Sequence, residues 1–231
     1  SGIGSILDYA AEVDMKDAKS LSNSSSAEKI TEMESMYNRH AQDFKKSIRA
    51  VSNLGPRGSV AVHLTACASP AILEKFSAFL TQWQQLFVDK INPDGTLSVS
   101  ELEKLLCCLF QGNESKQREL LERLVPQNQD AVDELSWTTL MEPADFLDLN
   151  PDQELKLSKL DTTELEQLQA FHRRGHELAQ EAKECGTRLF VDAEQVRYQL
   201  AIDHLVWVLQ RKFNATTDTK HPTVHGTFQC Y

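Results

Sequence analysis

Polar side chains follow two apolar, strand-like runs in the last part of the chain. Asp192 and Glu194 follow the run around Leu189, and Gln229 follows the run that begins at Thr223. Side chains alternate between the two faces of a strand, so Asp192 and Glu194 would point to the same side. Carboxylates and amides at the ends of neighbouring parallel strands are placed to contact a ligand. The alternatives are that Asp192 caps the next helix, that Glu194 is solvated, and that Gln229 lies at an exposed edge.

A further candidate, His63, interrupts an apolar run of β-branched and small residues over 59–68. A buried imidazole needs a hydrogen-bonding partner, because burying an unpaired polar group is costly. His63 is therefore either a core histidine with such a partner or a residue of a site.

The segment 90–101 nearly fits a calcium-binding loop of the EF-hand type. Asn92 and Asp94 stand at its third and fifth positions, a glycine makes the sharp turn, and Glu101 stands where a bidentate ligand is needed. The first position fails, because Lys90 puts a cation where a carboxylate belongs. We interpret the segment as a degenerate EF-hand-like loop, with Asn92, Asp94 and Glu101 as candidate ligands of Ca²⁺.

Composition narrows the classes of partner. A formal net charge of -10 over 231 residues argues against nucleic acid, which requires a basic face. No apolar run approaches the ~20 residues that cross a bilayer. The 5 cysteines are odd in number and form no C-x-x-C pair, which favours a reducing compartment over a disulfide framework.

The candidate residues require strands that alternate with helices. The expected strands lie near Ile3, Val60, Leu189 and Thr223, and the expected helices cover 30–51, begin at 69–70 and at 161, and end near 213. This alternation indicates an α/β fold with a parallel sheet and right-handed crossovers.

Local signals fix several helix ends. Ser69 is a favoured N-cap, and Pro70 suits the first helical position because its missing N–H would be unpaired there. Asp161 and Glu164 have the spacing of a capping box. Gly186 stands where a left-handed C-terminal cap is needed.

Changes in composition and hydrophobic pattern along the chain predict three segments. Residues 1–88 carry the first two β/α units, and residues 89–160 form a helical, acidic insertion that contains the EF-hand-like loop. Residues 161–231 supply a long helix and the third and fourth strands, and the chain stops within the fourth.

Four stretches of the chain, taken in order, resemble the proline dehydrogenase family, specifically its eukaryotic mitochondrial branch. The matching stretches are GIGSILDYAAE, VAVHLTACASP, GTRLFVDAEQVRYQLAIDHLVWVLQRKFN and HPTVHGTFQCY. The resemblance covers the strands and most helices. The insertion matches in position and in its EF-hand-like character.

This resemblance implies a partial (β/α)₈ TIM-like barrel, represented by its first four strands. It implies an enzyme that binds FAD, oxidises L-proline to 1-pyrroline-5-carboxylate and passes electrons to a quinone. It also implies a mitochondrial location, on the matrix side of the inner membrane, with peripheral membrane association. The chain would be about half of the catalytic barrel, with the later strands beyond Tyr231, so these residues alone are expected to be inactive.

The resemblance also assigns residues. Asp192 falls on the substrate-site aspartate of the third strand, Gln229 on the glutamine beside the flavin, and Asp8 on the aspartate of the first strand. His63 stands where the family has a lysine that helps to hold the substrate carboxylate, so we expect weaker proline binding. The alternatives are a hydroxyproline dehydrogenase, or a catalytically weakened homologue with a calcium-binding or interaction role.

Overall fold

Packing divides the chain into two compact units in the computed structural model. Unit 1 consists of Ser1–Glu74 and Ala170–Tyr231, and unit 2 is Lys75–Gln169. The structure describes residues 6–8, 26–53, 58–125, 129–151, 155, 157–214 and 221–230. Helices α2 (Pro70–Val88) and α6 (Thr162–Cys185) each contribute residues to both units.

Unit 1 is built on a parallel sheet. Its strands are β1 (Ile6–Asp8), β2 (Ser59–Val62), β5 (Arg188–Val191) and β6 (Val224–Gly226), in the order β1-β2-β5-β6. Every neighbouring pair in this sheet is parallel. The predicted α/β class and parallel sheet are therefore confirmed, while the partial barrel stays a prediction. The start of the first strand near Ile3 lies outside the described residues.

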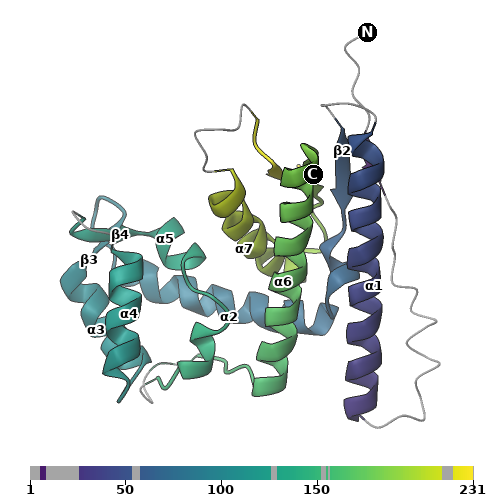
Figure 1. Ribbon diagram of the computed structural model, residues 1–231. Coiled ribbons are helices and arrows are strands. Elements are labelled where there is room, and N and C mark those ends of the chain that lie inside the picture. The colour runs from purple at the N-terminus through teal and green to yellow at the C-terminus, as the bar shows by residue number, and fades with distance from the viewer. Residues whose placement is uncertain are drawn as a thin grey trace. The chain divides into compact units, whose positions relative to one another are not determined.

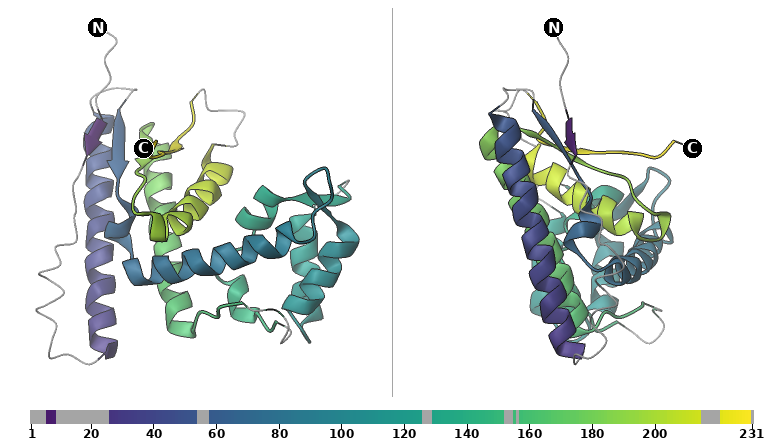
Figure 2. Two further views of the ribbon diagram at one scale, coloured as in Figure 1. Left: turned by 180° about the vertical axis from the view of Figure 1, so that it is seen from behind. Right: turned by 90° about the vertical axis from the view of Figure 1, so that its right-hand side faces the viewer.

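Helices cover the sheet of unit 1. They are α1 (Ser26–Ser52), the short 3₁₀ helix η2 (Leu64–Cys67), the later part of α6, and α7 (Val196–Phe213). Helices α1 and α6 lie side by side and run in the same direction, as Figures 1 and 2 show, and ion pairs join Lys45 to Glu177 and Arg49 to Glu181. Their buried apolar side chains include Phe44, Ile48, Phe171, Leu178, Ile202 and Leu205.

Unit 2 contains two segments, each with a short strand between two helices, and the two strands pair with each other. The first runs through α2, β3 (Thr96–Ser98) and α3 (Val99–Leu109), and the second through α4 (Glu114–Leu124), β4 (Ala131–Asp133) and α5 (Glu134–Thr139). Strands β3 and β4 are antiparallel, and Leu97 lies opposite Val132, both buried. A short 3₁₀ helix, η3 (Asp145–Asp148), follows.

Two stacked, fully buried indoles belong to unit 2. The ring centroids of Trp83 and Trp137 are 4.3 Å apart and the ring planes differ by 1°. Each indole N–H points to the backbone carbonyl of the other residue, at 3.5 Å from Trp83 and 3.1 Å from Trp137. Phe79 and Phe146 extend the cluster. Because both buried indole donors have acceptors, the pair adds aromatic packing without an unpaired polar group.

The predicted helix signals are confirmed. Helix α2 begins at Pro70. At the start of α6, the Glu164 amide donates to Asp161 at 2.9 Å and the Asp161 amide donates to Glu164 at 2.8 Å, which is the reciprocal capping box. Gly186 has a φ of 62°, the left-handed conformation that its cap position requires.

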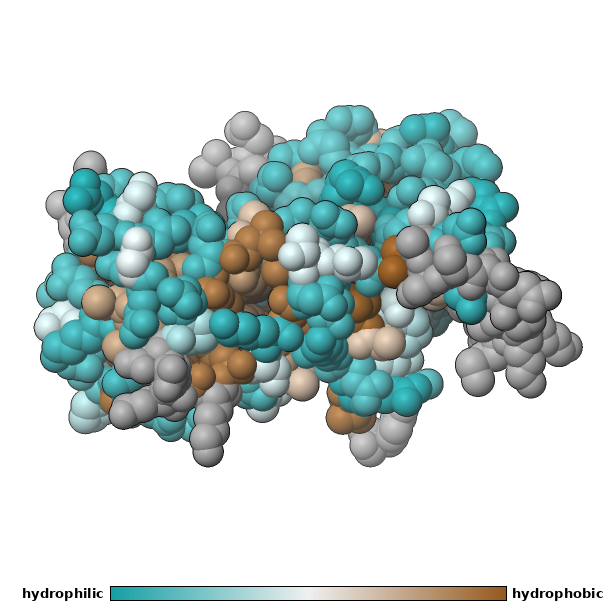
Figure 3. All heavy atoms as spheres, turned by 90° about the horizontal axis from the view of Figure 1, so that it is seen from below, coloured by the Kyte–Doolittle hydropathy of each residue, from teal (hydrophilic) through white to brown (hydrophobic). Residues whose placement is uncertain are grey.

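Hydrophilic residues predominate on the face shown in Figure 3, and apolar residues show between them. In unit 1 the exposed apolar side chains include Ile6 and Leu7 of β1, which is an edge strand of the sheet. An edge strand with exposed apolar residues is open to pairing with further chain.

Candidate active site

Asp8, His63 and Asp192 lie at the carboxyl ends of three adjacent parallel strands, β1, β2 and β5. Asp8 is paired with Ala61, and Val62 is paired with Val191. His63 and Asp192 each follow one of these paired valines, so they are level with each other. His63 still has an extended backbone, with φ -94° and ψ 108°.

The alternation of side chains along β2 determines the face of the sheet to which these side chains point. Ala61 and His63 point to the same side, because they are two residues apart. Asp8, level with Ala61, shares that side. The register of the sheet therefore brings two carboxylates and one imidazole together.

The distances confirm that these side chains meet. His63 Nε2 lies 3.5 Å from Asp192 Oδ2 and 3.7 Å from Asp8 Oδ1. The exposed fractions of the side chains are 36% for His63, 28% for Asp192 and 56% for Asp8, so the cluster is open to solvent on one side. Within the part of the chain that the structure describes, it is the only group of three acidic, histidine or cysteine side chains close enough to share a metal ion.

Asp192 is the most enclosed of the three. Burial raises the pKa of its carboxyl above the ordinary value, the charge of His63 opposes this change, and the carboxylate of Asp8 adds to it. A raised pKa makes the carboxylate of Asp192 a better proton acceptor than an ordinary aspartate. The cluster can thus attract a cationic group and accept a proton from it.

A second contact ties together the turns that carry His63 and Asp192. Glu194 accepts a hydrogen bond from the Thr65 amide at 3.1 Å and another from the Thr65 hydroxyl. Each of these residues lies two positions beyond a site residue. The alternative that Glu194 is only solvated is therefore wrong. Sequence reasoning missed Thr65 as its partner, although the equal offsets from His63 and Asp192 are a signal of such a contact.

Gln229 lies beyond β6 rather than within the cluster. Its side-chain amide donates to the carbonyl of Ala193 at 3.3 Å, and the hydroxyl of Thr227 accepts from the Ala193 amide at 2.7 Å. The segment after β6 therefore runs along the segment after β5. Gln229 is exposed and directly follows Phe228, which is 77% exposed.

Buried polar contacts support the 3₁₀ turn that follows His63. The guanidinium of Arg174 donates to the carbonyl of Cys67 at 2.8 Å and pairs with Glu34. His40 contacts the carbonyl of Ala66 through its Nδ1 at 2.8 Å. These contacts join α1 and α6 to the turn, so they position His63 without touching it.

The candidate calcium ligands of unit 2 have other partners. Asp94 accepts from the Thr96 amide at 3.0 Å and from its hydroxyl at 2.8 Å, and these bonds lower the pKa of its carboxyl. Glu101 pairs with Lys104, which lowers the pKa of Glu101. Neither Asp94 nor Glu101 belongs to a group of three acidic, histidine or cysteine side chains that could share a metal ion among the described residues. The structure therefore gives calcium binding at Asn92, Asp94 and Glu101 no support.

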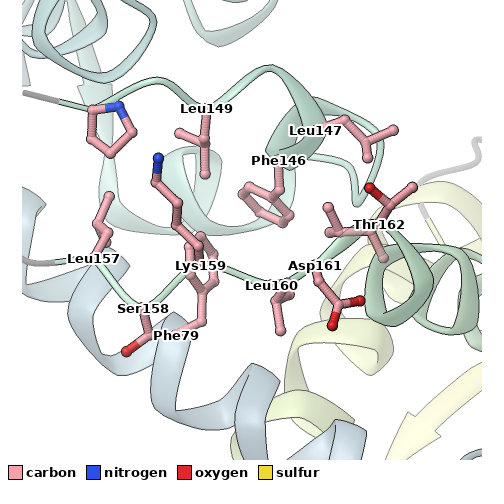
Figure 4. Close-up of a pocket in the computed structure, with 12 residues that line it drawn as sticks. Phe79, Phe146, Leu147, Leu149, Leu157, Ser158, Lys159, Leu160, Asp161 and Thr162 are labelled. Atoms are coloured by element: carbon pink, nitrogen blue, oxygen red, sulfur yellow. The ribbon is translucent and has the colours of Figure 1, made fainter.

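Unit 2 also has an apolar hollow of about 260 Å³. Figure 4 shows Phe79, Phe146 and Leu160 among the side chains around it, with Lys159 beside them. None of the residues that line the hollow belongs to the cluster of Asp8, His63 and Asp192.

No helix among the described residues is both long and apolar enough to cross a membrane.

Comparisons with known proteins give relatives named proline dehydrogenase 1 and hydroxyproline dehydrogenase. The chain is 29% identical over 209 residues to proline dehydrogenase 1, mitochondrial, of Homo sapiens, a match that covers 83% of this chain and 34% of the relative. The Drosophila melanogaster protein of the same name is 24% identical over 206 residues, covering 83% of this chain and 29% of the relative. Hydroxyproline dehydrogenase of Bos taurus is 33% identical over 105 residues, covering 42% of this chain and 22% of the relative.

The chain thus resembles mitochondrial proline dehydrogenases over most of its length and spans about a third of the length of the relatives named proline dehydrogenase 1. No family model matches the chain, and no solved structure matches it.

Proposed function

We propose that this chain supplies part of the active site of a mitochondrial, FAD-dependent proline dehydrogenase that passes electrons to a quinone. The observation that carries the proposal is the convergence of Asp8, His63 and Asp192 at the carboxyl ends of parallel strands. The resemblance to proteins named proline dehydrogenase supports it. The matrix side of the inner membrane and peripheral membrane association belong to the same proposal.

The cluster suits an amino acid with a secondary ammonium group. The carboxylates of Asp8 and Asp192 attract the ammonium, and Asp192 is the residue placed to take its proton. His63 is placed to donate a hydrogen bond to the substrate carboxylate. In the proposed reaction one ammonium proton would move to Asp192, and the ring carbon next to the nitrogen would lose a hydride to the flavin when the flavin is bound. The product would be 1-pyrroline-5-carboxylate protonated on its nitrogen.

Two residues that follow β6, Phe228 and Gln229, could contact a flat heterocyclic cofactor. Gln229 offers an exposed amide, and Phe228 offers an exposed aromatic face. When bound, the flavin would supply the hydride acceptor. Gln229 is held by Ala193, one residue after Asp192, so a group that contacts Gln229 would lie near the substrate position.

His63 provides the contact with the substrate carboxylate in this proposal. A lysine at this position would be a full cation at neutral pH, and its ammonium group would donate a charge-assisted hydrogen bond to the substrate carboxylate. A hydrogen bond to a charged group is worth about 1.5–3 kcal/mol, and 1.4 kcal/mol is a factor of about ten in binding. We therefore expect His63→Lys to strengthen proline binding by about tenfold or more.

The test uses the full-length gene product that contains this chain. Purified protein should carry a flavin, identified by its absorbance, and should reduce a quinone analogue when proline is added. Asp192→Asn should abolish turnover, whereas Asp148→Asn, an exposed change in unit 2, should leave it unchanged. His63→Lys should lower KM for proline. Absence of both flavin and proline-dependent reduction would refute the proposal.

The second candidate is hydroxyproline dehydrogenase, which the match to the Bos taurus protein of that name favours. The same assay separates the two, because a higher kcat/KM with hydroxyproline than with proline would select the second. A catalytically weakened homologue would bind flavin without turning over either substrate. A calcium-binding role would require Ca²⁺-dependent heats that Glu101→Gln removes, and the partners of Asp94 and Glu101 count against it.

A further inference from the structure

We propose that Asp8, His63 and Asp192 form a binding site for Zn²⁺. Zinc takes imidazole nitrogen and carboxylate oxygen ligands, and sites with three protein ligands keep a fourth position for water or another molecule. When the imidazole binds in its neutral form, the two carboxylates match the charge of the ion. The inference goes beyond the proposed oxidation and does not depend on it.

The distances within the cluster fit a shared ion better than direct hydrogen bonds. His63 Nε2 is 3.5 Å from Asp192 Oδ2 and 3.7 Å from Asp8 Oδ1, and both separations exceed those of ordinary N–H···O bonds. Around a tetrahedral zinc with bonds of about 2.0–2.1 Å, neighbouring ligand atoms lie about 3.3 Å apart. One ligand atom from each of the three residues lies within 4.8 Å of the other two. Small side-chain movements would complete the coordination.

The backbone holds these ligands in place before any ion binds. Asp8 is the last residue of β1, and His63 and Asp192 directly follow β2 and β5; these three strands are adjacent in the sheet and fixed in register. The amide of Asp192 also donates to the carbonyl of Val62 at 3.1 Å, and Glu194 ties the following turn to Thr65. A pre-formed site loses less conformational entropy on binding than a flexible one.

The cluster also leaves room for an ion to enter. All three side chains are partly exposed, so solvent reaches the ligands. An ion here would occupy the position that the proposed function gives to the substrate ammonium. We therefore expect Zn²⁺ to inhibit proline oxidation competitively, in a manner that depends on His63.

Zinc binding can be measured on the tag-free 231-residue chain without any activity assay. Zn²⁺ is titrated in competition with a chromophoric chelator. We expect one equivalent to bind. Removing a residue that only hydrogen-bonds to a metal ligand lowers metal affinity by about 10–100-fold. Removing a ligand itself, as in His63→Ala or Asp192→Asn, should therefore lower zinc affinity by at least about 100-fold.

Matched variants control for other sources of binding. His221→Ala removes an exposed histidine elsewhere, and Glu101→Gln removes the acidic end of the loop in unit 2; both should bind zinc like the parent. His63→Lys places a cation in the cluster and should abolish binding while keeping a long side chain. Circular dichroism of each variant verifies that it is folded, and Asp8→Asn repeats the test at the more exposed ligand.

Co²⁺ gives a second readout, because a four-coordinate cobalt ion has characteristic visible absorption bands. These bands should appear with the parent and disappear with His63→Ala. The inference is overturned if the parent binds no zinc, or if folded His63→Ala and Asp192→Asn keep the parent affinity. Zinc binding without proline oxidation by the full-length protein would refute the proposed function alone, and oxidation without zinc binding would refute this inference alone.

Discussion

Replacement of Asp145 by asparagine should destabilise unit 2. The Asp145 side chain is 3% exposed and receives Lys116 at 2.6 Å and Arg123 at 2.8 Å. It also accepts the backbone amide of Glu142 at 2.7 Å. Asp145→Asn keeps the size of the side chain but removes its charge, which leaves two partly buried cations short of a counter-charge.

The size of the effect follows from the remaining partners. Breaking a buried ion pair by removing one member costs about 3–5 kcal/mol. Glu119 still pairs with Lys116 at 3.1 Å and with Arg123 at 2.5 Å, but it is largely exposed. We therefore expect a loss near the lower limit, about 3 kcal/mol in the free energy of unfolding at neutral pH.

The same contacts fix the pH dependence. Burial would raise the pKa of Asp145, but hydrogen bonds from Arg123 and Lys116 outweigh it and lower that pKa. A lowered folded-state pKa means that the carboxylate stabilises the fold above its unfolded pKa of about 3.9. This contribution is lost as the pH falls through the lower, folded-state pKa. The difference between parent and Asp145→Asn should therefore shrink in acid.

Urea unfolding followed by tryptophan fluorescence measures the effect. The chain has 3 tryptophans, of which Trp83 and Trp137 belong to unit 2, so a Trp207→Phe background makes the signal specific for that unit. Asp148→Asn, an exposed change close in sequence, serves as the control. A loss below about 1 kcal/mol at pH 7, or an undiminished difference in strong acid, would refute the reasoning.

Three further predictions test other contacts. Glu194→Gln should lower the stability of unit 1 by about 1 kcal/mol and weaken zinc binding. Adding Thr65→Val to this variant should cause little further loss of stability. Additive losses in urea unfolding would show that the two residues do not interact. Trp137→Leu should remove the near-ultraviolet circular dichroism of the stacked pair with Trp83 and cost about 2 kcal/mol, and an unchanged spectrum would contradict the stacking. Gly186→Ala should cost about 1 kcal/mol in thermal unfolding, because its φ of 62° is strained for alanine although a Cβ would meet no atom within 4 Å; an unchanged Tm would contradict this.

Local signals in the sequence predicted much of the fold. The capping box of Asp161 and Glu164 and the proline at position 70 define helix starts through contacts within a few residues, which sequence spacing reveals. The strands were recognisable because apolar, β-branched runs are bounded by turn residues. The sequence pattern placed Asp192 and Gln229 at the ends of neighbouring strands, and the family resemblance added Asp8 and His63. The structure brings Asp8, His63 and Asp192 together, with Gln229 beyond β6.

Contacts between distant residues were not predictable in this way. Arg174 is buried against Glu34 and the carbonyl of Cys67, which lie on other elements, and its own helix has an ordinary amphipathic pattern. The pairing of β3 with β4 was also missed, because three-residue strands carry too little periodicity to be recognised. Partners of this kind depend on tertiary packing, which a single sequence does not display.

In the sequence, unit 2 lies between β2 and β5, and this order affects how the protein folds. These strands are neighbours in the sheet, yet the whole of unit 2 separates them in the chain. Pairing strands across so long a connection carries a loop-closure entropy that must be overcome before the contacts form, and high contact order slows folding. Early collapse of unit 2 would shorten the effective connection. Refolding should therefore show burial of Trp83 and Trp137 before the His63 edge of the sheet assembles.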